Sequence, residues 1–333
     1  MRVVLGPAGP WLDHGPPVRP AGEHAVRVRI ELAGICRSDL KEVAGVRHGV
    51  SQFGHEIVGV VEESTAPGLP SGRRVALDPN VGIDRGTGFA TSMWAVGPPD
   101  RLTAALPAVP PRIAARRLVF AEPLACARHC LDTVVRHLGG SAAGARLGVL
   151  GAGTAGVLIA LLGQAAGCEV LLANRGAERR SFLRRRGVID APVLPPDAVP
   201  SGSLDAAVVA TSFVLPEILG EALRMAAPGG LVLPYGGTAP GDALPGLDCD
   251  LDTVRRRQLT VATAWCGKSV RIAGSYGTAP GDFAAALRHL VDPEVAPERV
   301  ERLITREVRL AELPRVLRDG LAGPQFGKTL VLP

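Results

Sequence analysis

The spacing of hydrophobic and polar positions divides the chain into two regions with different rhythms. Over residues 24–35, Val26, Val28 and Ile30 alternate with charged residues, and this period of two predicts a half-buried strand. Short apolar runs separated by glycine and proline predict further strands at 57–61, 74–77 and 93–96. The first third of the chain is therefore expected to be an irregular antiparallel β domain, followed by a helical pattern over 112–138.

From residue 147 onward, apolar strands alternate with helical stretches, as expected for βαβ units around a parallel sheet. The predicted strands are 147–150, 169–173, 204–211 and 231–235, and the predicted helices are 154–166, 177–186 and 216–226. Two more helices, 282–290 and 311–321, and a strand at 329–332 end the chain. We expect an α/β protein in which residues 1–125 and 277–333 form a β domain and residues 126–276 form an inserted doubly wound domain.

Composition indicates which partners and which cellular compartment to expect for the protein. The net charge of +5 comes from arginine, and the arginine runs at 184–186 and 255–257 are not interleaved with aromatic residues, so we expect no nucleic-acid partner. Six cysteines without regular spacing indicate a reducing compartment. Because the N-terminus lacks a long apolar run, we predict no signal peptide and a cytoplasmic location.

Residues 147–173 are almost wholly apolar and long enough to cross a bilayer. Glycines interrupt this stretch repeatedly, and Glu169 would lie unpaired within the membrane at high energetic cost. We therefore predict that the stretch belongs to a folded core and that the protein has no membrane partner.

The motif G-x-G-x-x-G follows the strand predicted at 147–150. Gly151 permits a tight turn, Gly153 permits close approach of a pyrophosphate, and Gly156 permits close packing of the helix on the strand. Thr154 and Ala155 occupy the intervening positions and open the helix, whose N–H groups point at the anion. The sequence predicts a dinucleotide site; the alternative is a glycine-rich turn without a ligand.

The residues after the next strand favour NADP(H) over NAD(H). A free ribose 2′-hydroxyl usually pairs with a carboxylate at this point, but the chain has Asn174 and Arg175 there. Asn174 does not repel a 2′-phosphate, and Arg175 can pair with it, with Arg179 as a further contact. In the alternative interpretation, Arg179 and Arg180 are simply exposed helix residues.

Three separate pieces of sequence carry residues that suit a metal. They are Gly-Ile-Cys-Arg-Ser-Asp at 34–39, Phe-Gly-His-Glu at 53–56 and Phe-Ala-Glu-Pro-Leu at 120–124. Cys36 and His55 are donors suited to Zn²⁺, and Glu122 can add an oxygen. Three protein ligands leave one position for a substrate oxygen, which zinc would polarise. Alternatively, Cys36 is a buried small residue and His55 a core histidine.

These pieces, in this order and followed by G-x-G-x-x-G, resemble the zinc-dependent medium-chain dehydrogenase/reductase family over nearly the whole chain. The resemblance implies a GroES-like catalytic domain and a Rossmann cofactor domain, in a homodimer or homotetramer. The Glu-Pro-Leu piece resembles the polyol and sugar branch, which includes sorbitol, threonine and aminocyclitol dehydrogenases.

The resemblance also implies roles for individual residues. Cys36, His55 and Glu122 would be the zinc ligands, and Glu56 would be a nearby carboxylate able to replace one of them or to orient the metal-bound water. Three other assignments follow from the same motifs: Ser38 as proton relay, Asp39 as partner of the free ring nitrogen of His55, and Arg37 as a pyrophosphate contact. The spacing adds Cys126, which lies four residues after Glu122 on the same face of a helix and could compete as a ligand, although core packing is favoured. Ser38 has a second interpretation as a helix cap, and His48 is expected on an exposed loop.

The chain departs from the family pattern at three places, of which one is the somewhat short interval from Cys36 to His55, which should reshape the substrate cleft. No cysteine lies between Asp78 and Trp94, where the family carries a structural-zinc lobe, so one zinc per chain is expected. Residues 263–271 look like an insertion near the strand that often pairs subunits, which leaves the oligomeric state open.

The leading hypothesis is hydride transfer between NADP(H) and a secondary alcohol or ketone of a polyol, sugar or aminocyclitol, with ketone reduction in antibiotic biosynthesis as one setting. The rivals are a zinc-free enoyl or quinone reductase of the same fold and a non-catalytic nucleotide-binding protein.

Overall fold

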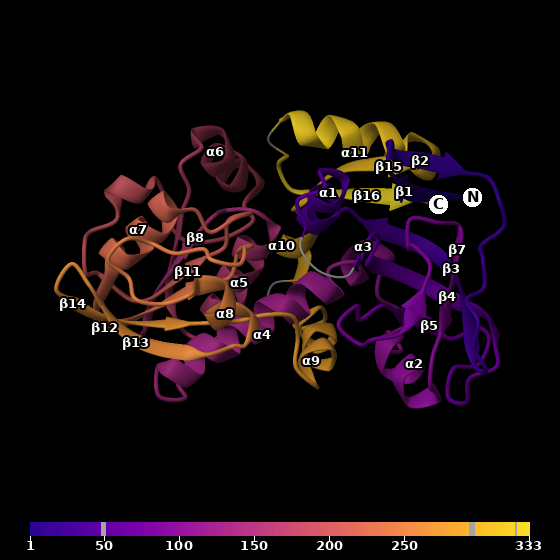
Figure 1. Cartoon of the computed structure of the whole chain (residues 1–333), viewed down its shortest axis with the longest axis horizontal. Coiled ribbons are helices and arrows are strands. Elements are labelled where there is room, and N and C mark those ends of the chain that lie inside the picture. The colour runs from indigo at the N-terminus through magenta and orange to yellow at the C-terminus, as the bar shows by residue number, and fades with distance from the viewer. Residues whose placement is uncertain (48–50, 293–296, 324) are drawn as a thin grey trace. The chain divides into compact units, whose positions relative to one another are not determined.

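A computed structural model of the chain describes residues 1–47, 51–292, 297–323 and 325–333, so His48 lies outside the described residues. The chain forms two compact units (Figure 1). The first unit comprises Met1–Glu122, Ala286–Val291 and Ile304–Pro333, and the second comprises Pro123–Ala285 and Asp292–Leu303. The described part of the chain contains no helix that is both long and apolar enough to span a bilayer.

The first unit is built on a sheet in the order β15-β16-β3-β4-β5, with β7 also paired to β3 and β6 paired to β7. Its strands are β3 (Ala25–Gly34), β4 (Glu56–Ser64), β5 (Arg74–Ala76), β6 (Asp84–Arg85), β7 (Ser92–Val96), β15 (Ile304–Arg309) and β16 (Lys328–Leu332). A separate hairpin joins β1 (Arg2–Gly6) to β2 (Gly9–Asp13). The alternation predicted over residues 24–35 is strand β3, whose residues Val26, Val28 and Ile30 are buried in the core.

The end of the chain completes this sheet. Strand β16 pairs antiparallel with β3, with Leu330 opposite Gly34, and parallel with β15. The helices of the first unit are α1 (Arg37–Val43), α2 (Pro99–Ala105), α3 (Ala115–Leu118) and α11 (Leu313–Ala322). Because β16 lies beside the end of β3, residues near position 328 reach the segment that carries Cys36.

The second unit has a sheet in the order β10-β9-β8-β11-β12-β14-β13, in which β13 is the only antiparallel strand among the described pairings. Its strands are β8 (Arg146–Leu150), β9 (Glu169–Ala173), β10 (Val193–Leu194), β11 (Leu204–Val209), β12 (Ala226–Pro234), β13 (Thr260–Trp265) and β14 (Lys268–Ala273). Its helices include α5 (Thr154–Ala165), α6 (Ala177–Arg186), α7 (Pro216–Met225), α8 (Leu251–Arg256) and α10 (Pro297–Glu301). Helices α4 (Ala121–His137) and α9 (Asp282–His289) cross the boundaries between the units.

The six parallel strands follow the Rossmann order, which reverses between β8 and β11. The turn after β8 is therefore at the point where such sheets bind nucleotides. The predicted fold class, an α/β protein with a β domain and a doubly wound parallel-sheet domain, is confirmed.

The division between the units differs in detail from the predicted ranges 1–125, 277–333 and 126–276. Residues 123–125, 277–285 and the described part of 292–303 cluster with the second unit rather than the first. There Arg299 pairs with Asp190, and Arg302 donates to the Gly187 carbonyl oxygen at 2.6 Å.

The segment expected as an insertion lies within a hairpin of β13 and β14. Cys266 and Gly267 form its turn, with φ of 50° and 76°. In β13, exposed Thr260, Ala262 and Ala264 alternate with half-buried residues, so this edge strand has too few large apolar residues to be recognised from sequence.

Helix α5 packs so closely on the turn after β8 that a Cβ at Gly156 would lie 1.9 Å from the Gly151 carbonyl oxygen. We predict that Gly156→Ala lowers the free energy of unfolding by about 2 kcal/mol or more, because backbone atoms must move. Gly220→Ala in α7 is the matched control, since nothing lies within 4 Å of the added Cβ. It should stabilise by about 0.5–1 kcal/mol. Urea unfolding followed by circular dichroism measures both, and equal effects of the two variants would refute the prediction.

Candidate active site

A buried carboxylate fixes the position of Cys36. Strand β3 ends at Gly34, and helix α1 begins directly after Cys36. Asp39, in the first turn of α1, accepts hydrogen bonds from the Cys36 N–H at 2.7 Å and from the Gly54 N–H at 2.9 Å. Its carboxylate is fully buried. Asp39 therefore ties the start of α1 to the turn that precedes β4, and so ties Cys36 to His55.

The two ring nitrogens of His55 have different surroundings. Nδ1 lies 2.9 Å from the Gln52 carbonyl oxygen and 3.6 Å from Asp39 Oδ1, so the carbonyl is the nearer acceptor and Asp39 acts mainly through its charge. Nε2 lies 3.5 Å from Ser38 Oγ and 4.0 Å from Glu122 Oε2. Burial disfavours the imidazolium, but the charge and hydrogen bonding of Asp39, together with Cys36 and Glu122, outweigh it and hold the pKa of His55 well above 6.5.

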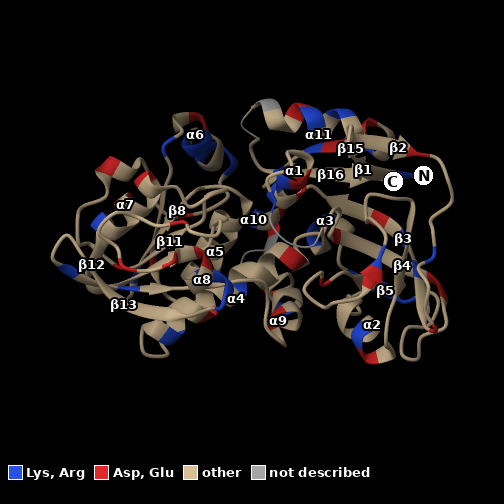
Figure 2. Cartoon of the chain, in the orientation of Figure 1, with Lys and Arg blue, Asp and Glu red and all other residues tan. Residues whose placement is uncertain are grey.

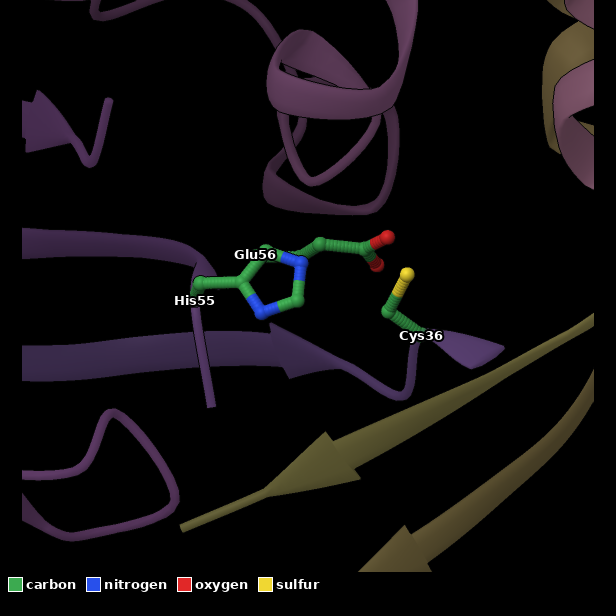
Figure 3. Close-up of side chains that lie close together, drawn as sticks. All are labelled: Cys36, His55 and Glu56. Carbon is green, nitrogen blue, oxygen red and sulfur yellow. The ribbon is translucent and has the colours of Figure 1, made fainter. Parts of the chain in front are cut away.

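Cys36, His55 and Glu56 come together in one group, with ligand atoms within 4.8 Å of one another (Figure 3). The Cys36 thiol points toward the Glu56 carboxylate beside the imidazole ring. Glu56 Oε1 is buried and has no hydrogen-bond partner among the described residues. A buried carboxylate oxygen left without a partner is costly, so this oxygen suits an interaction with a cation. Thiolate, imidazole and carboxylate together are a donor set that fits Zn²⁺.

Lys328 is a member of this site that the sequence analysis missed. Its ammonium forms an ion pair with Glu56 Oε2 and donates to the Ile35 carbonyl oxygen at 3.3 Å, and both charged side chains are buried. Burial lowers the pKa of Lys328, but the Glu56 carboxylate, with Cys36 and Glu122, raises it by more, so that it lies above 10.5. Lysine occurs only three times in the sequence, and this rarity is the only sequence feature that could have drawn attention to Lys328.

The dinucleotide motif forms the turn between β8 and α5. The Gly151 N–H donates to the Ala173 carbonyl oxygen at 2.8 Å, and Gly153 precedes the first helical residue, Thr154, which Ala155 follows. The Ala152 N–H donates to Asn174 Oδ1 at 3.3 Å. Asn174 therefore links this turn to the end of β9, the two segments that the motif predicts to meet.

Arginines gather after β9 and along α6 (Figure 2). Arg175 is exposed, and Arg179 is half-buried. Arg180 is also half-buried and donates to the Asn174 and Arg175 carbonyl oxygens, each at 2.6 Å. Arg180 thus fixes the turn that presents Arg175, a role beyond that of an exposed helix residue.

The structure gives the positions of two further predicted site residues but does not test their predicted roles. Arg37 is exposed in the first turn of α1. Cys126 is half-buried on α4, in the second unit. A pyrophosphate contact for Arg37 and metal binding by Cys126 stay predictions.

The Lys328–Glu56 pair provides a test of the site's electrostatics. Lys328→Met leaves a buried carboxylate without its cation, so we predict a loss of about 3–5 kcal/mol in the free energy of unfolding. Adding Glu56→Gln to Lys328→Met should recover part of the loss, because the uncompensated charge is gone. Guanidinium unfolding of metal-free protein measures these differences.

The pH dependence follows from the raised pKa of Lys328. The contribution of the ion pair to the free energy of unfolding is fully present below pH 10.5, the pKa of Lys328 in the unfolded state. It is lost as the pH rises through the higher pKa that Lys328 has in the folded state. If wild type and Lys328→Met still differed by the same free energy of unfolding at a pH well above the folded-state pKa of Lys328, this assignment would be contradicted.

Comparison with known proteins supports the fold assigned to both units. Residues 22–97 match the family model for the alcohol dehydrogenase GroES-like domain. No curated protein is detectably similar in sequence to this chain.

Solved structures resemble the whole chain. A protein from Sinorhizobium meliloti 1021 that is described as a zinc-binding dehydrogenase, solved bound to NADP, is 23% identical, with a TM-score of 0.71 over 94% of this chain and 93% of that one. The 2R,3R-butanediol dehydrogenase of Bacillus subtilis is 18% identical, with a TM-score of 0.72 over 100% and 99%. The L-idonate 5-dehydrogenase of Escherichia coli K-12 is 20% identical, with a TM-score of 0.68 over 93% and 91%. At these identities the likenesses show a shared fold.

Proposed function

Because residues 22–97 form an alcohol dehydrogenase GroES-like domain and the chain has the fold of the medium-chain dehydrogenase/reductase family, we propose that it is a zinc-dependent oxidoreductase. It transfers hydride between NADP(H) and a secondary alcohol or ketone. The observation that carries this proposal is the group of Cys36, His55 and Glu56, whose ligand atoms lie within 4.8 Å of one another and in which Glu56 Oε1 has no hydrogen-bond partner among the described residues.

The metal would be held by Cys36, His55 and a carboxylate. Two carboxylates are available, since Glu56 belongs to the group and Glu122 lies 4.0 Å from His55 Nε2. Lys328 holds one oxygen of Glu56, which leaves that residue one oxygen to offer. Glu122 remains the ligand that we propose, with Glu56 able to replace it. When bound, zinc supplies Lewis-acid polarisation of the substrate oxygen.

Ser38 is the proposed start of the proton path. Its hydroxyl lies 3.5 Å from His55 Nε2, the ring nitrogen that faces the ligand group, and the residue is half-buried. In the oxidative direction, Ser38 Oγ accepts the proton of the substrate hydroxyl and passes its own proton toward solvent. Asp39 fixes the backbone of Cys36, two residues before this hydroxyl.

NADP(H) is the proposed cofactor because the end of β9 offers cations and no carboxylate. Asn174 is fixed by the Ala152 N–H, and Arg180 holds the carbonyl groups of the turn so that exposed Arg175 is presented to a ligand. The relative from Sinorhizobium meliloti was solved with NADP.

The proposed substrate class is a polyol, sugar or aminocyclitol. The relatives from Bacillus and Escherichia are named for butanediol and L-idonate, both of which carry secondary carbinols. With NADPH as the cofactor, ketone reduction is the expected direction. A setting in antibiotic biosynthesis stays a hypothesis.

We predict one zinc ion per chain. Protein purified without chelator should contain about one equivalent of zinc by elemental analysis, and Cys36→Ser should contain far less, because a thiolate ligand is gone. Cys266→Ser is the matched control, since Cys266 is exposed on the β13–β14 turn. Near-zero zinc in wild-type protein would end the metal mechanism and favour the zinc-free reductase.

We predict that NADPH binds at least about tenfold more tightly than NADH, because charge-assisted hydrogen bonds recognise the 2′-phosphate. Arg175→Ala and Asn174→Asp should each reduce this preference, whereas Arg185→Ala, at the end of α6, should not. Fluorescence titration of the reduced cofactors gives the dissociation constants. A wild-type preference for NADH would overturn the cofactor assignment.

A further inference from the structure

The segment that replaces the family's metal-binding lobe holds the turn that carries His55. We call residues 79–89 the short segment and residues 52–54 the ligand turn. Gln52 Nε2 donates to the Pro79 carbonyl oxygen at 3.2 Å, and the Gly88 N–H donates to the Gly54 carbonyl oxygen at 3.0 Å. The short segment therefore contacts the ligand turn near both of its ends.

Two features leave little freedom in these contacts. The rings of Phe53 and Phe89 meet edge to face, with centroids 5.0 Å apart. Gly54 has φ of +65°, and a Cβ there would lie 2.7 Å from the Phe89 backbone nitrogen, so the two backbones approach more closely than a side chain allows. Packing thus presses the short segment directly against the residue before His55.

Arg85 is the charged member of this contact. Its guanidinium donates to the Gln52 carbonyl oxygen at 3.1 Å and to the Gly86 carbonyl oxygen at 2.9 Å. The Gln52 carbonyl is also the acceptor 2.9 Å from His55 Nδ1. One carbonyl oxygen, with two lone pairs, therefore receives both the arginine and the ring of a candidate ligand.

The charges around Arg85 give it a second effect on the site. Asp39 and Glu42 attract the guanidinium, while Arg47 repels it. Burial lowers the pKa of Arg85 to about 10, so the group stays cationic at neutral pH. Arg85 therefore adds a positive charge near Asp39, the carboxylate that holds Cys36 and Gly54.

We propose that Arg85 is a positioning residue for the metal ligand His55. It fixes the Gln52 carbonyl that accepts from Nδ1, so that Nε2 carries the lone pair for the metal. This inference rests on the proposed function, because it concerns the same metal site. It assigns the short segment a task in that site without a second metal.

Zinc affinity of the whole protein tests the inference directly. Competition with a chromogenic chelator at neutral pH gives the Zn²⁺ dissociation constant for wild type, Arg85→Met and Arg85→Lys. We expect Arg85→Met to bind zinc about 10–100-fold more weakly, the range seen when groups that orient metal ligands are removed. Arg85→Lys should lie between it and wild type, because it keeps the charge but lacks the fork that reaches two carbonyls.

Arg101→Met is the matched control. Arg101 donates to the Gly82 carbonyl oxygen of the same short segment at 3.3 Å from an exposed position, and it makes no described contact with the ligand turn. Its zinc affinity should stay within about twofold of wild type, as expected for a surface substitution. The Co²⁺-substituted proteins give a second readout, since the visible bands of Arg85→Met should shift if His55 is misoriented, whereas those of Arg101→Met should not.

The outcomes separate the inference from the proposed function. If wild type binds no zinc, both fall. If wild type binds zinc and Arg85→Met matches it in affinity and Co²⁺ spectrum, only the inference falls. If Arg85→Met does not fold, judged by urea unfolding and NADPH binding, Arg85→Lys decides: unchanged affinity and an unchanged Co²⁺ spectrum in that variant refute the inference.

Discussion

The buried carboxylate of Asp39 is the constraint on which the candidate site depends. A charge removed from water is tolerated only when hydrogen bonds and opposite charges surround it. Asp39 meets this condition through two backbone N–H groups, of Cys36 and Gly54, which belong to segments far apart in the chain. Satisfying one side chain therefore sets the distance between the helix that begins after Cys36 and the turn that carries His55.

The same requirement explains why the end of the chain returns to this point. Glu56 is as buried as Asp39, and its partner is Lys328, which reaches it because β16 pairs with the end of β3. The strand pairing and the ion pair stabilise each other. The pairing of β16 with β3 positions the Lys328 ammonium, and the ammonium offsets the cost of burying the Glu56 carboxylate. The first unit can complete its site only after its last strand has docked.

The sequence predicted those features that depend on the type and spacing of residues. Alternation gave β3, the glycine pattern gave the turn after β8, and Cys36 and His55 stood out as metal donors. It did not find Lys328 or Arg85, whose tasks depend on partners distant in sequence. It also assigned the free ring nitrogen of His55 to Asp39, whereas the nearest acceptor is the backbone carbonyl of Gln52, a group that every residue carries and that no motif can mark.

The charges gathered in the first unit bear on the divalent ion that we propose for this site. Cys36 as thiolate, Asp39, Glu56 and Glu122 would contribute four negative charges, and Lys328 and Arg85 contribute two positive ones. A protonated His55 supplies only one more, at the expense of its own role as a ligand, which fits its raised pKa. A doubly charged cation balances the group while leaving the imidazole neutral, and it gives the unpartnered oxygen of Glu56 something to face. The surplus of buried negative charge therefore favours a metal at this position for the same physical reason that it raises the pKa of His55.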